Sequence, residues 1–489
     1  MSTTPHATRI PSRSSYPPGG TPEDAAAVGF HDLTEELSDV DLELTGTIPA
    51  WLAGSLLRTG PARWDLNDGS VNHWFDGLAM LHRFAITDGR VRYANQLLRG
   101  KAGRAYEQTG TIGYREFATD PCRTRFQRIA SLFDPGLTDN GAVNVGRLGE
   151  RWLAMTETPL AVVFDPETLD SLGVERRAGK LSFPNAHPHY DHATGDMLDL
   201  RVAMGPRSRY EVVARHPAGG ERVIARIPVR RPGYQHSFGL TPKYAIVTES
   251  PLVVDPKQLA LSGRPFIDNF RWLPEQGSRL WAIDRASGEV RGPWTAPAMF
   301  CFHHVNAFED GDDLTVDLLA YDDASVVRAL TLDRLRDAQM PQVPTLQRYV
   351  LTPGTDAVTP RRLAETPFEL PRINGRHQGR PYNVVFGTGS HDGEDGPTGG
   401  FLETVTKTTI DDGRTAVWRD PGAFAGEPIF VRRPDGADED DGVLLTIVLE
   451  PARQTSSLVV LDARDLTEVA RARVPHHIPF GFHGQFARA

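Results

Sequence analysis

Short apolar runs closed by turn residues recur along the chain from about Thr45 onward. Leu81 to Ile86, for example, runs up to the turn Asp88-Gly89. Runs of this kind between Gly, Asp and Asn turns are typical of antiparallel strands joined by hairpins. Helical spacing is expected mainly in two stretches, Arg123 to Phe133 and Asp333 to Gln339. The pattern therefore predicts an all-β protein.

One hairpin pattern recurs, in which a strand meets a turn opened by Asp and a second strand returns. The aspartates are Asp165, Asp284 and Asp462, which are 119 and 178 residues apart, close to two and three times 59. A repeat of roughly 59 residues suggests a β-propeller with inserted loops. Such hairpins also recur by chance in any β protein, so the spacing alone is thin support.

Composition favours one large, turn-rich body, because the 46 Gly and 38 Pro of the 489 residues are dispersed along the chain. The N-terminal segment is rich in Ser, Thr, Pro and Gly. We expect residues 1–28 to form a disordered tail and residues 29–489 a single propeller domain. Neither an apolar stretch of about 18 residues nor a signal-peptide pattern occurs, so we expect no membrane-spanning helix and no export.

The charge and the cysteine content limit which partners the protein is expected to bind and in which cell compartment it is expected to lie. The formal net charge is −10, and acidic and basic residues are mixed, which argues against nucleic acid as a partner. Cys122 and Cys301 are too few for a disulfide framework. We therefore expect a cytoplasmic protein with free thiols.

Four of the 16 histidines stand among aromatic and small residues, where a buried imidazole needs partners for its nitrogens: His187, His236, His303 and His483. Their spacings of 49, 67 and 180 residues add to five steps of about 59. One histidine per blade would converge on a single ion, and neutral imidazole is a common ligand for iron, zinc and copper. Each alone is more simply a satisfied core histidine.

A local cluster of His187, His189 and His192 is an alternative metal site. Pro188 and the strand-like surroundings do not give the i, i+4 face of a helical site, so we favour the dispersed set. Glu157, Glu369 and Glu427 lie in mainly apolar or turn contexts and are candidates to orient the ring N–H groups. From sequence alone, each is more often a solvated charge at a strand end.

Longer motifs resemble the carotenoid cleavage oxygenases, the non-haem iron family of the animal β-carotene oxygenases and retinoid isomerohydrolases. The resemblance runs nearly end to end, and its strongest segments are His73 to His82, Ala186 to His189, Phe302 to Glu309 and Phe368 to Asn374. It implies a seven-bladed β-propeller under a dome of loops and short helices.

The resemblance also implies a site. One Fe(2+) per chain would lie on the axis, held by His187, His236, His303 and His483, with Glu157, Glu369 and Glu427 bonded to three of the imidazoles. Val143 would lie near an open position of the iron, and His304 would be a packing residue. No catalytic side chain is expected beyond the metal centre.

The implied activity is cleavage of a carotenoid C=C bond with O₂ to give two carbonyl products. Our most specific expectation is central (15,15′) cleavage of a β-carotene-like substrate to retinal. Cleavage of apocarotenoids or of stilbenes is the alternative. Stilbene cleavers anchor a phenol with a Tyr and a Lys, and this chain has no Lys from residue 102 to 179, although Lys101 lies nearby. A non-catalytic propeller that binds apolar ligands is the alternative of another class.

We also expect a surface through which a substrate could enter from a membrane. Phe126, Ile129 and Phe133 would share one apolar helical face beside several arginines, which suits peripheral membrane contact. An ordinary helix packed on the propeller would show the same pattern. We expect a monomer or weak dimer.

Overall fold

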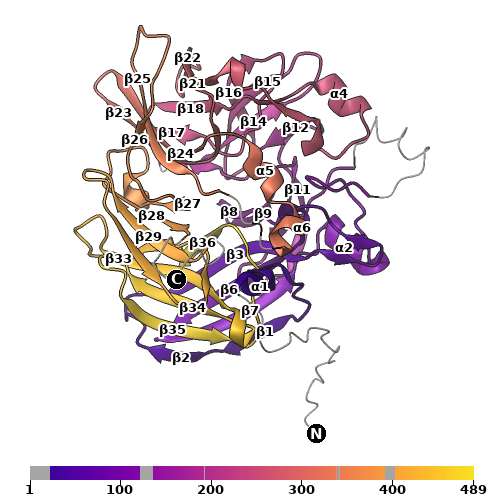
Figure 1. The fold of residues 1–489 in the computed structure, drawn as a ribbon, viewed down its shortest axis with the longest axis vertical. Coiled ribbons are helices and arrows are strands. Elements are labelled where there is room, and N and C mark those ends of the chain that lie inside the picture. Colours follow the sequence, from indigo (N-terminus) through magenta and orange to yellow (C-terminus); the bar gives the residue numbers. More distant parts are fainter. Residues whose placement is uncertain (1–21, 122–135, 192, 338, 340–341, 391–401) are drawn as a thin grey trace.

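Seven sheets of four to six strands surround a central axis in the computed structural model, which describes residues 22–121, 136–191, 193–337, 339, 342–390 and 402–489 (Figure 1). Each sheet is one blade, and the expected seven-bladed β-propeller is confirmed. The apolar runs of the sequence form its strands, because each central strand is covered on both faces by neighbouring blades.

Blades 1 to 4 follow one another in chain order, except that blade 1 also contains the last strand of the chain. Blade 1 contains β36 (Gly484–Arg488), β3 (Gly54–Arg63), β6 (Leu78–Thr87), β7 (Arg90–Leu97) and β1 (Leu37–Asp41). Blade 2 contains β8 (Asn144–Leu148), β9 (Arg151–Met155), β10 (Leu160–Phe164) and β11 (Ser171–Arg176). Blade 3 contains β12 (Ser182–Pro184), β13 (His189–Tyr190), β14 (Met197–Ala203), β15 (Arg209–Arg215) and β16 (Glu221–Pro228). Blade 4 contains β17 (Gly239–Leu240), β18 (Tyr244–Glu249), β21 (Ser278–Asp284) and β22 (Val290–Ala296).

The other three blades complete the ring. Blade 5 contains β23 (Phe300–Asp310), β24 (Asp313–Tyr321), β25 (Thr345–Leu351) and β26 (Arg361–Arg362). Blade 6 contains β27 (Glu369–Arg372), β28 (Val384–Gly389), β29 (Thr404–Thr409) and β30 (Thr415–Arg419). Blade 7 contains β31 (Phe424–Ala425), β32 (Ile429–Arg432), β33 (Gly442–Glu450), β34 (Thr455–Asp462), β35 (Glu468–Val474) and β2 (Glu43–Gly46). Two small ribbons lie outside the blades, β4 (Asp65–Leu66) with β5 (Gly69–Ser70), and β19 (Leu252–Val254) with β20 (Phe270–Trp272).

Two strand exchanges close the ring. β2, from the start of the chain, is the outer strand of blade 7 and pairs with β35, where Leu44 faces Ala472. β36, from the end of the chain, pairs with β3 in blade 1. Figure 1 shows β2 in purple beside the yellow strands β34 and β35. The first and last segments are thereby interlocked.

The Asp-opened turns occupy equivalent places in three blades. Asp165, Asp284 and Asp462 each join the third strand of a blade to its fourth, and each side chain accepts backbone N–H bonds in its turn. Their blades are two and then three positions apart in the ring. The spacing of about 59 residues is therefore the blade repeat.

A largely aromatic cap covers the axis. The α-helices among the described residues are α1 (Pro22–Ala27), α2 (Lys101–Thr109), α4 (Pro256–Leu261), α5 (Ser325–Ala329) and α6 (Leu332–Arg336). The cap cluster includes Val326 of α5 and Leu335 of α6, with Phe30 and Phe480 among its rings. The prediction at Asp333 to Gln339 corresponds to α6, whereas α2 was not predicted and Arg123 to Phe133 lies outside the described residues.

The N-terminal prediction needs a correction. Residues 22–28 belong to α1 and to the start of the following 3₁₀ turn, not to a disordered tail. Ala26 and Val28 are buried in the cap, and the Phe30 ring packs edge-on against Trp74. A short apolar run after a Pro-rich segment thus finds a partner surface that the sequence pattern does not reveal. Of the helices described, none is long and apolar enough to cross a membrane.

Candidate metal centre

Four blades each present one histidine to the axis. His187 lies between β12 and β13, His236 lies just before β17, His303 is on β23 and His483 lies just before β36. In ring order these are blades 3, 4, 5 and 1, which explains the sequence spacings of one, one and three blade repeats. Blades therefore bring together side chains up to 296 residues apart.

The four side chains converge, with one nitrogen of each within 4.8 Å of the others. His187 Nε2 lies 3.1 Å from His236 Nε2, and His303 Nε2 lies 3.2 Å from His483 Nε2. Two nitrogens about 2.1 Å from one ion, at right angles to each other, lie about 3.0 Å apart. The donor set thus fits a single transition-metal ion.

A distortion of β23 separates His303 from its neighbour. Register shifts flank His304 in the pairing of β23 with β24. His303 faces the axis, whereas both ring nitrogens of His304 are bonded to hydroxyls, Nδ1 to Ser237 and Nε2 to Thr248, each at 2.8 Å. His304 is accordingly a packed, hydrogen-bonded core residue.

Three carboxylates accept hydrogen bonds from the outer ring nitrogens. Nδ1 of His236 lies 2.7 Å from Glu157, Nδ1 of His303 lies 2.6 Å from Glu369, and Nδ1 of His483 lies 2.7 Å from Glu427. These bonds place the proton on Nδ1 and leave the Nε2 lone pairs directed at the axis. Among the described residues, His187 has no such carboxylate, and its backbone N–H donates to Asn185 Oδ1 at 3.3 Å.

Burial favours the neutral form of His187 and His483. Burial and the other three rings hold the pKa of His187 well below its usual range, and burial lowers the pKa of His483 to about 4 even with Glu427 beside it. Burial alone would raise the pKa of Glu427, but Arg372 and His483 lower it to about 2. Neutral nitrogens backed by ionised carboxylates are the form that binds metal.

The local cluster predicted as an alternative is not assembled among the described residues. His189 Nε2 bonds to the carbonyl of Phe238 at 2.8 Å, and its Nδ1 lies 2.5 Å from the amide of Gln378. Its Nε2 therefore donates and its Nδ1 accepts, so neither nitrogen is free to bind a metal ion. His192 lies outside the described residues.

Two cavities meet beside the histidines. The larger, of about 370 Å³, has mostly apolar walls and runs past His236 and Glu157. The smaller, of about 60 Å³, is lined by His303 and His483. Both are bounded by Phe75, Val143 and His236, so Val143 lies at their junction next to the histidine cluster.

A sequence profile of the retinal pigment epithelial membrane protein family, RPE65, matches residues 30–488. The chain belongs to this family of carotenoid cleavage oxygenases. It is 31% identical to human β,β-carotene 15,15′-dioxygenase over 92% of this chain and 93% of that protein. It is 30% identical to the mitochondrial carotenoid-cleaving dioxygenase of Mustela putorius furo, over 96% and 99%.

Solved structures with a similar fold include an apocarotenoid oxygenase and a chimera of that enzyme with RPE65. Cobalt-substituted Synechocystis apocarotenoid oxygenase superposes with a TM-score of 0.85 at 26% identity, over 96% of this chain and 99% of that one. A chimera of that oxygenase with RPE65 gives a TM-score of 0.83 at 25% identity, over the same shares.

Two tyrosines of this carotenoid cleavage oxygenase were missed by the sequence predictions. Tyr234 donates to Glu157 at 2.7 Å, and Tyr321 donates to Glu369 at 3.0 Å. Tyr234 lies two residues before His236, a spacing that could have drawn attention to it. Tyr321 gives no such signal, because the pairing of β23 with β24 brings it to the site.

Cavity-lining charges were missed too. Glu116 is buried in the wall of the larger cavity, and burial raises its pKa well above the usual range. Lys257 lies in the same wall. Lys101, the lysine considered as a phenol anchor, is exposed at the start of α2 and lines neither cavity at the histidine cluster.

Proposed function

We propose that this chain is an Fe(II)-dependent dioxygenase that cleaves a C=C bond of a carotenoid with O₂ to give two carbonyl products. The observation that carries the proposal is the set of four converging imidazoles where two apolar cavities meet. When bound, Fe(II) would supply the one-electron chemistry that O₂ requires to react with a C=C bond. His187, His236, His303 and His483 are the proposed ligands, one ion per chain.

The other residues of the site orient the imidazoles and bind the substrate. Glu157, Glu369 and Glu427 fix the rotation and tautomer of three imidazoles. Phe75 and Phe117, whose ring centroids lie 5.3 Å apart, provide an apolar wall in the larger cavity. Such a wall excludes water and holds a polyene by contact area. We propose that Val143 limits access to an open position on the ion.

Central (15,15′) cleavage to retinal is our proposal for the bond, supported by the relatives named as 15,15′-dioxygenases. A long substrate that passes the histidines would place one arm in each cavity. Apocarotenoid cleavage is the alternative, favoured by the difference between 370 and 60 Å³. Stilbene cleavage has less support, because Lys101 lines neither cavity.

The test measures both the iron content of the protein and the identity of the products. Iron-loaded protein is incubated in air with β-carotene, an apocarotenal and a hydroxystilbene, and products are identified by mass. We expect retinal from β-carotene and loss of both iron and cleavage in His303→Ala. His216→Ala is the matched control, since His216 is exposed in the turn between β15 and β16 and is not one of the four converging histidines.

Two results would contradict the proposal. Retention of iron and activity in His303→Ala would exclude that ligand. Recovery of all three substrates intact from iron-loaded protein would favour a propeller that only binds apolar ligands.

We further propose a cytoplasmic monomer or weak dimer, folded as one domain, with peripheral membrane contact through Phe126, Ile129 and Phe133. These three residues lie outside the described residues. The larger cavity supports the proposal, because its wall includes Leu181, which is 53% exposed, and residues of α4, where Leu261 is 77% exposed. An apolar rim suits entry of a membrane-dissolved substrate.

A further inference from the structure

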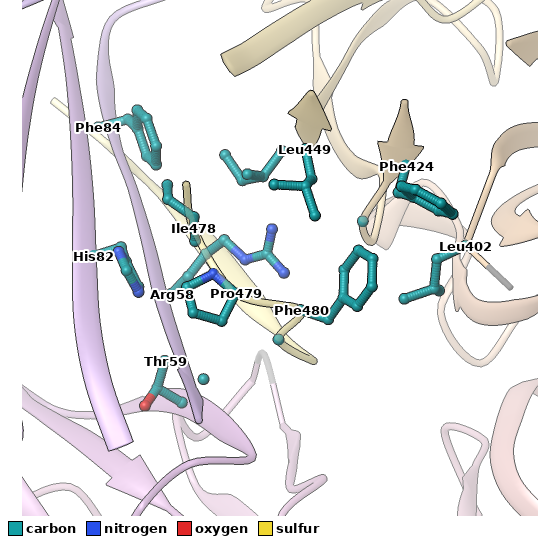
Figure 2. Close-up of a pocket in the computed structure, with 14 residues that line it drawn as sticks. Arg58, Thr59, His82, Phe84, Leu402, Phe424, Leu449, Ile478, Pro479 and Phe480 are labelled. Carbon is teal, nitrogen blue, oxygen red and sulfur yellow. The ribbon is translucent and has the colours of Figure 1, made fainter. Parts of the chain in front are cut away.

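A small cavity holds the side chain of Arg58 between blades 1 and 7 (Figure 2). Its volume is about 20 Å³. The walls come from β3, β6 and β33 and from the segment 478–481 that leads to His483. In Figure 2 the guanidinium points away from His82 and toward Leu449 and Phe480.

Arg58 is short of partners for a buried cation. It is 6% exposed, and its one side-chain hydrogen bond in the described structure is from Nη2 to the carbonyl of Phe482 at 3.3 Å. Of the ion pairs among described residues, none includes Arg58. A guanidinium carries five N–H donors and stays charged, so most of its capacity faces the cavity.

The nearest acid is already engaged. Glu427 attracts Arg58, but its carboxylate oxygens accept from His483 Nδ1 at 2.7 Å, from Arg372 Nε at 2.7 Å and from the Gly484 N–H at 3.0 Å. Arg372 also repels Arg58. Buried Arg58 and partly exposed Arg372, whose side chain is 23% exposed, therefore share one buried carboxylate, and their two positive charges exceed its single negative charge.

Neighbouring polar groups do not remove that excess. The Gly426 backbone lies against Nη1, close enough that a Cβ there would be 3.3 Å away. Its carbonyl accepts from Thr446 Oγ1 at 2.8 Å, and the Thr59 hydroxyl donates to Gly141 at 2.7 Å. Phe84 and Ile478 add only carbon surface. A buried charge without compensation is costly, and a water molecule would supply no charge.

We propose that this cavity binds one small monatomic anion of the halide class, with Arg58 as its main ligand. The volume of about 20 Å³ is small, which favours a monatomic anion over sulfate, phosphate and carboxylates. The anion would complete the packing between the first and last blades and fix Pro479, Phe480 and Gly481. It would thus stabilise ring closure independently of the proposed oxygenase activity.

Full-length protein is unfolded thermally in NaCl, NaBr and sodium gluconate at equal ionic strength, from 1 to 100 mM. We expect the midpoint to rise by about 2–3 °C in either halide but not in gluconate. Arg58→Met should remove the halide dependence. Arg90→Met is the control, because Arg90 is exposed, and it should keep that dependence.

Crystals grown without chloride and soaked in dilute bromide give a second measurement that requires no variant. An anomalous bromine peak beside the Arg58 guanidinium is expected. The same midpoint shift in all three salts, or a cavity that contains only water in the bromide crystals, would overturn the proposal. If Arg58→Met fails to fold, the bromide peak in the natural protein decides. Neither readout depends on cleavage, so failure here leaves the dioxygenase proposal intact.

Discussion

At the scale of single residues, the proposed ligands differ in how they are held. His236, His303 and His483 are each oriented by a buried carboxylate, whereas His187 is positioned through its backbone bond to Asn185. The sequence predicted all four histidines from their aromatic surroundings. It could not separate His303 from His304 without the family resemblance, because adjacent residues on a strand face opposite sides and a local register shift sets which one faces the axis.

Glu369→Gln should weaken iron binding by about 10–100-fold, because an amide still accepts from His303 but carries no charge. Competition with a chelator of known affinity measures the change. Tyr321→Phe is the matched control, because it removes the other side-chain hydrogen bond to Glu369 and keeps the carboxylate. It should have a smaller effect. Equal affinity in Glu369→Gln and the natural protein would show that the carboxylate does not tune this site.

At the scale of elements, hairpins were predictable, whereas of the short helices described only α6 was predicted. The Asp-opened turns are local signals, since each side chain bonds to backbone N–H groups two or three residues on. α1 has only six residues and is held by contacts with the distant cap, whereas α2 is an amphipathic helix of nine residues that was not predicted. Contacts between distant segments leave little local pattern.

The stability of one short element, a 3₁₀ turn, depends on pH. Asp76 ends the 3₁₀ turn Trp74–Asp76 and joins it to another segment, accepting from the Ala118 N–H at 3.0 Å and from Thr119 Oγ1 at 2.6 Å. Burial raises the pKa of Asp76 from 3.8 to about 7. Its proton is thus held in the folded chain and released on unfolding. The contribution to stability is complete below about pH 4 and is lost as the pH rises to about 7, a change of about 4 kcal/mol at most.

Asp76→Asn keeps a neutral side chain at every pH and should flatten this dependence. Urea unfolding at pH 5 and pH 8 measures it, as the difference between the variant and the natural protein. Asp68→Asn, at an exposed position, is the control and should keep the natural slope. An unchanged slope in Asp76→Asn would contradict the assignment.

At the scale of the whole molecule, the blade repeat was visible in the sequence but the closure was not. A period of about 59 residues appears in the turns and histidines because each blade reuses one hairpin plan. The pairing of β2 with β35 joins residues more than 420 positions apart, as in Leu44 and Ala472. No local pattern encodes such a pair, and only the geometry of a closed ring requires it.

Leu44→Asp tests the closure. Leu44 packs on the apolar cluster between blades 1 and 7, and a charge there should lower the free energy of unfolding by about 2 kcal/mol. Glu43→Gln changes the exposed neighbour on the same strand and should have little effect. Denaturant unfolding compares the two. Equal stability of both variants would show that β2 contributes little to holding the ring.

The order of the blades along the chain also determines when each of the four histidines is made during synthesis. His187, His236 and His303 are made within 117 residues of one another, but His483 follows only after blades 6 and 7. A nascent chain therefore carries three of the proposed ligands through the translation of 180 further residues. The four proposed ligands can come together only once almost every blade has been made.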